Sequence, residues 1–260
     1  INVQGNSNST NGFFAKGIHH SVFDQITVRG ASTTGAGIRV EWCVLNTWIN
    51  ARVTGNDSSL PMSPVPKYGI MLTGIGGSGA QTTTQTLINP VMENLTQAGG
   101  AGIYIDNSTG TTMLGGVSES NTNGLILNGR GVNTTDAFFG VWFENNSNKD
   151  VWLIDSNGTS FYASKNIGSL LIEGASLRNM FVGGTIGSIG IASTAYMNLF
   201  QNNFIYGTVT DNAVATPTIG SSDRAGRRPV RCAPLRKSDP RPRSARPCGF
   251  SDDAVRRSIC

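Results

Sequence analysis

Four glutamates recur at nearly regular intervals and are the residues best suited to acid/base chemistry. Glu93, Glu119, Glu144 and Glu173 are separated by 26, 25 and 29 residues, and each stands two positions after an apolar residue. On successive parallel strands, neighbours would lie about 5 Å apart and alternates about 10 Å apart. Carboxylates at such distances repel one another, so some of their pKa values rise. Glycosidases use carboxyl pairs separated by roughly 5–5.5 Å or 6.5–9.5 Å, so the pattern predicts catalytic candidates, with Glu119 and Glu144 at the centre.

Two other interpretations of these glutamates stay open. Stacked carboxylates could hold a Ca²⁺ ion, which prefers oxygen ligands; no other cofactor or metal is expected. They could also form a structural ladder that accepts backbone hydrogen bonds at a turn.

A row of large side chains forms a second candidate site. The third residue of a recurring Gly-apolar-x-apolar pattern points away from the core, because the residues on either side of it point inward. An exposed aromatic row can bind a sugar, so we expect substrate binding by Arg39, Tyr104, Trp152 and Phe181. Met71 and Ile126 complete the row. It could instead contact a partner chain, or loops inserted at 58–67 and 74–86 could cover it.

Two short patterns alternate along the chain and predict the elements that carry these residues. The first is Gly-apolar-x-apolar, with copies beginning at Gly37, Gly69, Gly102 and Gly124 and looser copies at Asp150 and Asn179. The second is an apolar residue, any residue, then Gly or Glu and usually a small polar residue. Its copies begin at Val3, Val28, Val53, Val91, Val117, Trp142 and Leu171. Alternation with period two is typical of strands, and the links are rich in turn residues.

Repeating strands without crossover helices predict an all-β fold, a right-handed parallel β-helix, or solenoid, of roughly eight coils over residues 1–220. Ile103 should point into its core. Because Val3 already fits the second pattern, we expect the chain to begin in the middle of a coil. Asn56, Asn94 and Asn145 share a turn position, with Ser120 beside Asn121 in the fourth copy, and Asn tolerates the left-handed backbone of such a bend.

On these two patterns and the repeated Asn position, the chain resembles the pectate lyase-like superfamily, which includes polygalacturonases and bacteriophage tailspikes. The resemblance covers about residues 1–220 and implies polysaccharide as the ligand. The polygalacturonase motifs Asn-Thr-Asp, Gly-His-Gly and Arg-Ile-Lys are absent from that range. The segment Val151–Asp155 is similar to a pectate lyase segment, but Ser156 stands where that family has His. The resemblance therefore concerns the fold more than the chemistry.

Histidine and cysteine add no further catalytic candidate. His19 and His20 are adjacent, so in a strand they would face opposite ways and could not serve one site. Cys43 is the one cysteine before residue 221, and we expect it to be a small buried hydrophobic residue.

Charge separates the chain into two parts. Residues 1–220 carry nine Lys or Arg against twelve Asp or Glu, whereas residues 221–260 carry eleven against four. A mildly acidic body argues against nucleic-acid binding, and no apolar run approaches the roughly 18 residues of a membrane span. Residues 221–260 form a basic Arg/Pro-rich tail, either disordered or the product of a frameshift; a polyanion-binding arm is the alternative.

Three functions fit these observations. The chain is a polysaccharide-degrading β-helix acting as lyase or hydrolase, a polysaccharide-binding tailspike shaft that forms a homotrimer, or an adhesin-like solenoid without catalysis. We expect an extracellular or phage-tail location. The separation of the Glu carboxyls and the surroundings of the aromatic row distinguish these functions.

Overall fold

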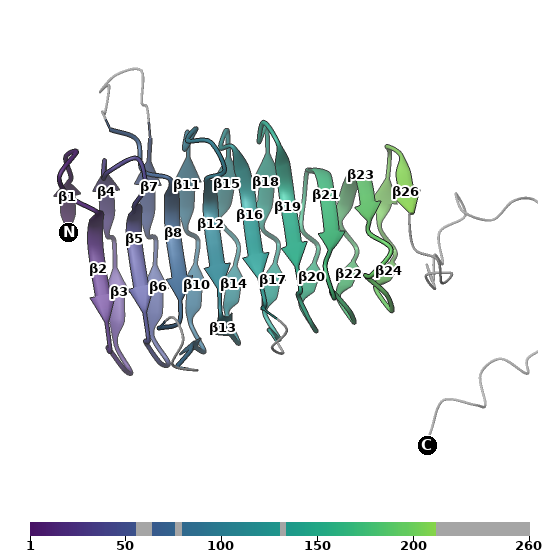
Figure 1. Ribbon diagram of the computed structural model, residues 1–260, viewed down its shortest axis with the longest axis horizontal. Coiled ribbons are helices and arrows are strands. Elements are labelled where there is room, and N and C mark those ends of the chain that lie inside the picture. Colours follow the sequence, from purple (N-terminus) through teal and green to yellow (C-terminus); the bar gives the residue numbers. More distant parts are fainter. Residues whose placement is uncertain (56–63, 76–79, 131–133, 212–260) are drawn as a thin grey trace, which may run out of the picture. The chain divides into compact units, whose positions relative to one another are not determined.

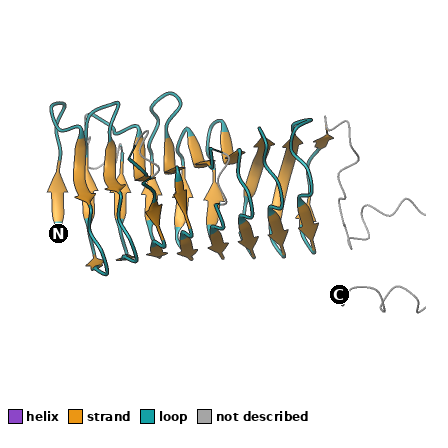
Figure 2. Cartoon of the chain, turned by 60° about the horizontal axis from the view of Figure 1, so that its bottom comes forward, coloured by secondary structure: helices purple, strands orange, loops and turns teal. Residues whose placement is uncertain are grey.

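The computed structural model describes residues 1–55, 64–75, 80–130 and 134–211, all within one compact unit, Ile1–Gly226. The predicted tail at 221–260, Asn56 and most of the 58–67 insertion lie outside the described residues. Every element in the described part is a strand, as Figure 2 shows, and no helix there is long and apolar enough to cross a membrane.

The strands form three large parallel sheets and one small one. Up to β18 the chain visits the six-, ten- and eight-stranded sheets in turn and then returns to the first. From β19 to β25 it alternates between the ten- and eight-stranded sheets, and in both parts strands pair with their equivalents one coil later (Figure 1). This stacking is consistent with a parallel β-helix, which confirms the predicted fold class at that level.

The strand bounds are as follows. The six-stranded sheet contains β1 (Asn2–Gln4), β4 (Thr27–Arg29), β7 (Arg52–Thr54), β11 (Val91–Glu93), β15 (Val117–Glu119) and β18 (Trp142–Glu144). The eight-stranded sheet contains β3 (Val22–Asp24), β6 (Thr47–Ile49), β10 (Thr86–Ile88), β14 (Thr112–Leu114), β17 (Ala137–Phe139), β20 (Ser160–Tyr162), β22 (Met180–Val182) and β24 (Leu199–Gln201). The ten-stranded sheet contains β2 (Asn11–Lys16), β5 (Ala36–Glu41), β8 (Tyr68–Thr73), β12 (Ala101–Asp106), β16 (Asn123–Asn128), β19 (Lys149–Ile154), β21 (Ile167–Glu173), β23 (Thr185–Ile191), β25 (Phe204–Ile205) and β26 (Val209–Asp211). Two short strands, β9 (Thr82–Thr83) and β13 (Ser108–Thr109), pair with each other.

The core consists of inward-facing ladders. Ile38, Ile70, Ile103, Leu125 and Val151 stack in the ten-stranded sheet and are all fully buried. In the eight-stranded sheet the middle residue of each strand points inward, and Phe138, Phe161, Phe181 and Phe200 stack with ring centroids 4.7–4.9 Å apart. Cys43 is buried as predicted, and burial raises the pKa of its thiol.

The repeated glycine of the first pattern has a steric origin. A Cβ built on Gly37 would lie 2.3 Å from Val53 Cγ1, and one on Gly102 would lie 2.2 Å from Ser118 Oγ. The inward side chains of the six-stranded sheet therefore occupy the space that a larger residue would need. Glycine is favoured here because neighbouring strands approach one another closely.

The sixth copy of the first pattern, which begins at Asn179, does not belong to the sheet that the sequence predicts for it. Met180–Val182 is β22 of the eight-stranded sheet, not a strand of the ten-stranded sheet. After β18 the coils have no strand in the six-stranded sheet, and equivalent positions such as Phe161 and Phe181 are only 20 residues apart. The shorter coils break the period on which the prediction relied.

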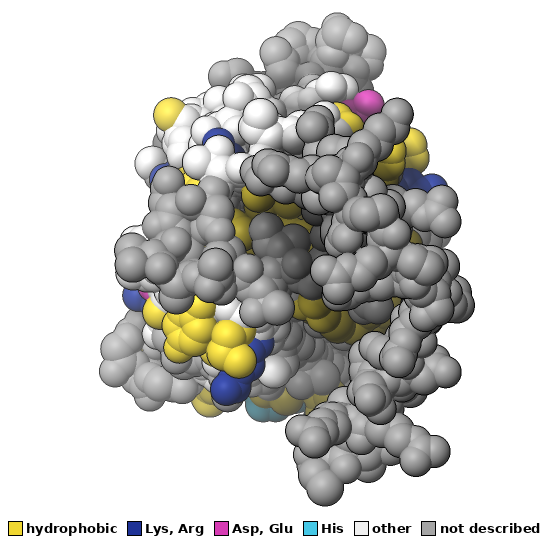
Figure 3. Space-filling view, turned by 90° about the vertical axis from the view of Figure 1, so that its right-hand side faces the viewer, with side chains coloured by type: hydrophobic (Ala, Val, Ile, Leu, Met, Phe, Trp, Pro, Cys, Tyr) yellow, Lys and Arg dark blue, Asp and Glu magenta, His cyan; other side chains and the backbone are white. Residues whose placement is uncertain are grey.

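At one end of the described stack, apolar side chains reach the surface. Phe204 of β25 and the following Tyr206 are 67% and 59% exposed. A view from that side shows hydrophobic side chains at the surface (Figure 3).

Candidate functional site

Three of the four predicted glutamates stand on adjacent rungs of one ladder. Glu93 of β11 pairs with Glu119 of β15, and Glu119 pairs with Glu144 of β18. The middle residues of these strands, Met92, Ser118 and Phe143, are fully buried. Because neighbouring side chains alternate between the two faces of a strand, the three glutamates lie on the outward face of the six-stranded sheet.

The fourth glutamate is not part of this ladder. Glu173 lies on β21 of the ten-stranded sheet, where it pairs with Ile154, and its Oε1 accepts a 2.9 Å hydrogen bond from Trp152 Nε1. The prediction that all four share one position is therefore wrong for Glu173.

The register of the earlier copies also differs from the prediction by one residue. Glu93 pairs with Thr54 and not with Gly55. The ladder position continues through Arg29 to Gln4. The sequence pattern aligned Val53 with Val91 because both are apolar. Val53 points inward, however, and Val91 points outward, so the alignment is shifted by one residue.

Asparagine has two roles at the turn after this sheet. Asn94, Ser120 and Asn145 adopt φ of 59°, 55° and 55°, so this position needs the left-handed backbone. The side-chain ladder lies one residue later: Asn121 Oδ1 accepts from Leu95 N at 2.9 Å, and Asn146 Oδ1 accepts from Asn121 N at 3.0 Å.

The three stacked carboxylates have different surroundings. Glu93 forms a 3.0 Å ion pair with Arg52 Nη2. Glu144 Oε2 accepts a 2.5 Å hydrogen bond from the indole N–H of Trp142. The Glu119 carboxylate has no hydrogen-bond or ion-pair partner among the described residues, and partial burial, then the charges of Glu93 and Glu144, raise its pKa. The middle carboxyl therefore stays protonated to a higher pH than a free glutamate, while Arg52 and Trp142 donate to its two neighbours.

An apolar row runs beside the acidic ladder. Val91, Val117 and Trp142 begin the same three strands and share the outward face with the glutamates. Lys165 pairs with Trp142 in an isolated bridge and places its Nζ 6.0 Å from the centroid of the indole ring. The sheet surface therefore offers acidic groups and an aromatic ring side by side.

The predicted sugar-binding row lies on a different sheet. Arg39, Tyr104 and Trp152 occupy one outward position of the ten-stranded sheet, together with Met71 and Ile126. Arg39 Nη2 is 2.6 Å from Glu41, and the Tyr104 ring stacks on Tyr68 with centroids 4.4 Å apart. Burial, helped by Asp106, raises the pKa of Tyr104 to about 12. Arg39, Tyr104 and Trp152 thus contact Glu41, Tyr68 and Glu173 in turn, and their sheet is not the one that carries the Glu93–Glu119–Glu144 ladder.

Phe181, the fourth residue predicted to bind sugar, is a core residue. It is 1% exposed and lies between Phe161 and Phe200 in the inward aromatic stack. It was misplaced because its strand belongs to the eight-stranded sheet, where the middle residue points inward.

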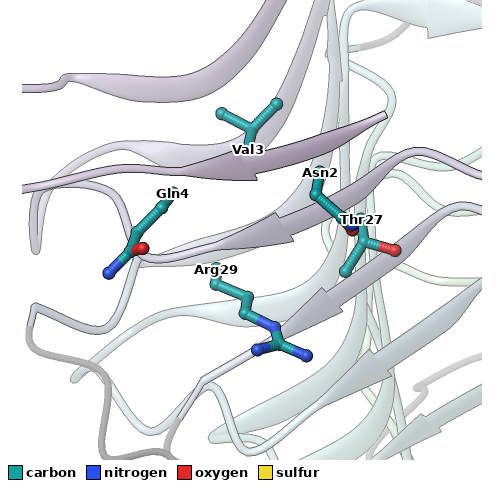
Figure 4. Close-up of a pocket in the computed structure, with 5 residues that line it drawn as sticks. All are labelled: Asn2, Val3, Gln4, Thr27 and Arg29. Atoms are coloured by element: carbon teal, nitrogen blue, oxygen red, sulfur yellow. The ribbon is translucent and has the colours of Figure 1, made fainter.

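The described residues contain no group of three His, Cys, Asp or Glu side chains that could hold a metal ion. A cavity of about 270 Å³ lies at the first rungs of the six-stranded sheet. It is lined by Asn2, Val3, Gln4, Thr27 and Arg29 (Figure 4). It lies at strands β1 and β4, two rungs before Glu93 on β11.

An outward apolar row on the eight-stranded sheet was not predicted from the sequence. Six consecutive strands end in an apolar residue: Ile49, Ile88, Leu114, Phe139, Tyr162 and Val182. Leu114 and Phe139 are each 40% exposed, and Phe139 stacks on Tyr162 with centroids 4.9 Å apart. Most of these strands share a three-residue pattern, in which a polar or small residue is followed by two apolar ones. This pattern could have been found in the sequence.

Comparison of the chain with protein-family models, with curated proteins and with solved structures finds no match.

Proposed function

We propose that this chain is a right-handed parallel β-helix of the pectate lyase-like kind that binds polysaccharide along the outward face of its six-stranded sheet. The single observation that supports this best is the Glu93–Glu119–Glu144 ladder, whose middle carboxyl has no partner among the described residues and whose third member accepts a hydrogen bond from Trp142. The right hand follows the general preference of parallel crossover connections. Roughly eight coils and an extracellular or phage-tail location belong to the same proposal.

The different surroundings of Glu119 and Glu144 suit a division of roles. Glu119, with its raised pKa, donates a proton to the glycosidic oxygen as the bond to the leaving sugar breaks. The Glu144 carboxylate, whose Oε2 accepts a hydrogen bond from the Trp142 N–H, attacks the anomeric carbon and forms a glycosyl ester. Water then hydrolyses this ester while Glu119 takes up the proton of the water. Adjacent rungs lie about 4.8 Å apart, which is close to the separation of retaining glycosidases.

The test compares Glu119→Gln and Glu144→Gln on a panel of bacterial and plant polysaccharides. Each change should lower turnover at least a hundredfold and leave binding and melting temperature unchanged. Glu173→Gln is the matched control, because Glu173 also accepts an indole hydrogen bond but lies on another sheet. If both ladder variants keep the parent's activity, or the parent has none on any substrate, the catalytic proposal is wrong.

A non-catalytic shaft is the second candidate, and the outward row of the eight-stranded sheet favours it. The row from Ile49 to Val182 contains no charged side chain over six rungs, and such a continuous apolar surface suits contact with another chain. A homotrimer in light scattering, together with loss of assembly in Leu114→Glu, would support this function.

A further inference from the structure

Trp42 lies at the corner where the ten-stranded sheet ends and the chain turns towards the eight-stranded sheet. Backbone hydrogen bonds connect this corner position from coil to coil, from Gly17 through Trp42 to Gly74 and Asn107. Gly17, Trp42 and Asn107 have φ of 64°, 51° and 53°. Three of these four residues therefore have a left-handed backbone, which Gly and Asn adopt easily and a large aromatic residue does not.

The strain is not offset by burial of the ring. Trp42 is 44% exposed, while Trp48 in the core is fully buried. Leu45, three residues on, is also 45% exposed and also has a positive φ, of 56°. A large side chain kept at a strained and exposed position suggests a role outside packing, since strain of this kind gathers at binding sites.

The neighbours of Trp42 make its ring a supported platform. A Cβ on Gly17 would lie 3.6 and 3.7 Å from Cε3 and Cζ3 of Trp42, so the six-membered ring rests beside a residue without a side chain. The His19 ring meets it edge-on, with centroids 6.4 Å apart and planes at 82°. His20 is exposed on the same turn. The ring is thus held from the backbone side, has an imidazole at its edge, and presents its exposed surface to solvent.

We propose that Trp42 is a saccharide-binding platform on which a pyranose ring of a glycan stacks, with the imidazole of His19 bonding its hydroxyls. A pyranose has an apolar C–H face and a polar rim, which match an aromatic face beside a hydrogen-bonding imidazole. A protein partner would need a much larger surface than one ring and Leu45 supply. The site shares its ligand class with the proposed function, but it does not require that Glu119 and Glu144 be catalytic.

The experiment follows the Trp42 indole N–H in ¹H–¹⁵N spectra while cellohexaose, maltohexaose and hexagalacturonate are added separately. The chain has four tryptophans, and the Trp42 signal is the one lost in Trp42→Gly. At least one saccharide should shift this signal in a saturable manner. Trp42→Gly should weaken binding of that saccharide at least tenfold in calorimetry, and Trp42→Phe should retain most of it.

Trp42→Gly separates binding from packing. Glycine relieves the positive φ, so the melting temperature should stay the same or rise while binding is lost. A fall of several degrees would show that the ring stabilises the fold, and the proposal would be wrong. Phe139→Ala, which removes an exposed ring from another sheet, is the control and should bind as the parent does.

The remaining outcomes decide the proposal as well. If none of the three saccharides shifts the Trp42 signal at millimolar concentration, or if anionic phospholipid vesicles shift it and saccharides do not, the saccharide platform is excluded. Loss of hydrolysis in Glu119→Gln with an unchanged Trp42 shift would confirm two separate sites. A Trp42 shift in a chain that hydrolyses nothing would contradict the catalytic proposal alone.

Discussion

The backbone N–H of Thr111 donates a 2.6 Å hydrogen bond to Oδ1 of Asp136, one coil further along. Asn residues fill the same corner position elsewhere: Asn46 accepts from Ser21 N at 2.9 Å, and Asn179 accepts from Thr159 N at 3.0 Å. The amide nitrogens of both Asn residues also donate to a backbone carbonyl of the preceding coil. Asp136 is 1% exposed, and its Oδ2 has no hydrogen-bond partner among the residues that the structure describes. A protonated Asp136 can donate in the same way as these amides, and burial raises its pKa to about 8.

Stability should therefore fall as the pH rises from about 4 to about 8. In this window the unfolded chain has released the Asp136 proton and the folded chain still holds it, so the free energy of unfolding decreases with pH. We expect Asp136→Asn to remove this decrease and to be more stable than the parent by a few kcal/mol at pH 8, since one pKa unit corresponds to about 1.4 kcal/mol. Urea unfolding of both proteins at pH 4, 6 and 8 measures this. Parallel curves for the two proteins would show that Asp136 is ionised in the folded chain.

Removing one neighbouring charge should lower the pKa of Glu119. Glu93 raises that pKa through charge repulsion, so Glu93→Gln should move the titration of Glu119 to lower pH. Carbon-13 NMR of the Glu119 carboxyl measures the shift without any assay of activity. Where hydrolysis is detected, the alkaline limb of its pH profile should move in the same direction. Glu173→Gln is the control and should leave the titration in place.

A methyl group at Gly37 should destabilise the fold. The added Cβ would meet Val53 Cγ1 at 2.3 Å, and overpacking of this kind costs about 1–3 kcal/mol. Denaturant unfolding of Gly37→Ala tests this. In the Val53→Ala background, where Cγ1 is absent, Gly37→Ala should lower the free energy of unfolding by less than it does in the parent. Additive effects in the double-mutant cycle would contradict the contact.

The inward aromatic stack should carry much more stability than the outward one. Phe161 is stacked between Phe138 and Phe181 and is 2% exposed, so Phe161→Ala should cost about 3–5 kcal/mol. Phe139→Ala removes an exposed ring of the same sheet and should cost far less. Thermal unfolding measures both variants. An equal loss of stability in the two would contradict the assignment of Phe161 to the inward face and Phe139 to the outward face.

A charged residue placed in the core tests which residues of the ten-stranded sheet point inward. Ile103 is fully buried, as the sequence predicts, so Ile103→Asp places an unpaired charge inside the stack and should give insoluble or unfolded protein. The neighbouring Tyr104→Asp, which points outward, should remain soluble with a lower melting temperature. A parent-like melting curve for Ile103→Asp would show that the side chain is outward.

The sequence by itself determined the class of the fold and most of one ladder. Period-two alternation and the repeated Gly before an apolar pair were enough to identify parallel stacked strands, because each coil must bury the same face against the next. The first five copies from Gly37 to Val151 align in the structure as predicted, and Glu93, Glu119 and Glu144 fall on adjacent rungs for the same reason.

Only the tertiary structure decided which sheet each segment joins and what surrounds each side chain. Glu173 and Phe181 fit the local patterns, but the coils after β18 omit one strand, and a local pattern contains no information about coil length. The Arg52–Glu93 ion pair, the Thr111–Asp136 hydrogen bond and the His19–Trp42 ring contact each join residues one coil apart, 41, 25 and 23 positions along the chain. Such contacts are set by the stacking distance between coils, which packing of the whole core determines.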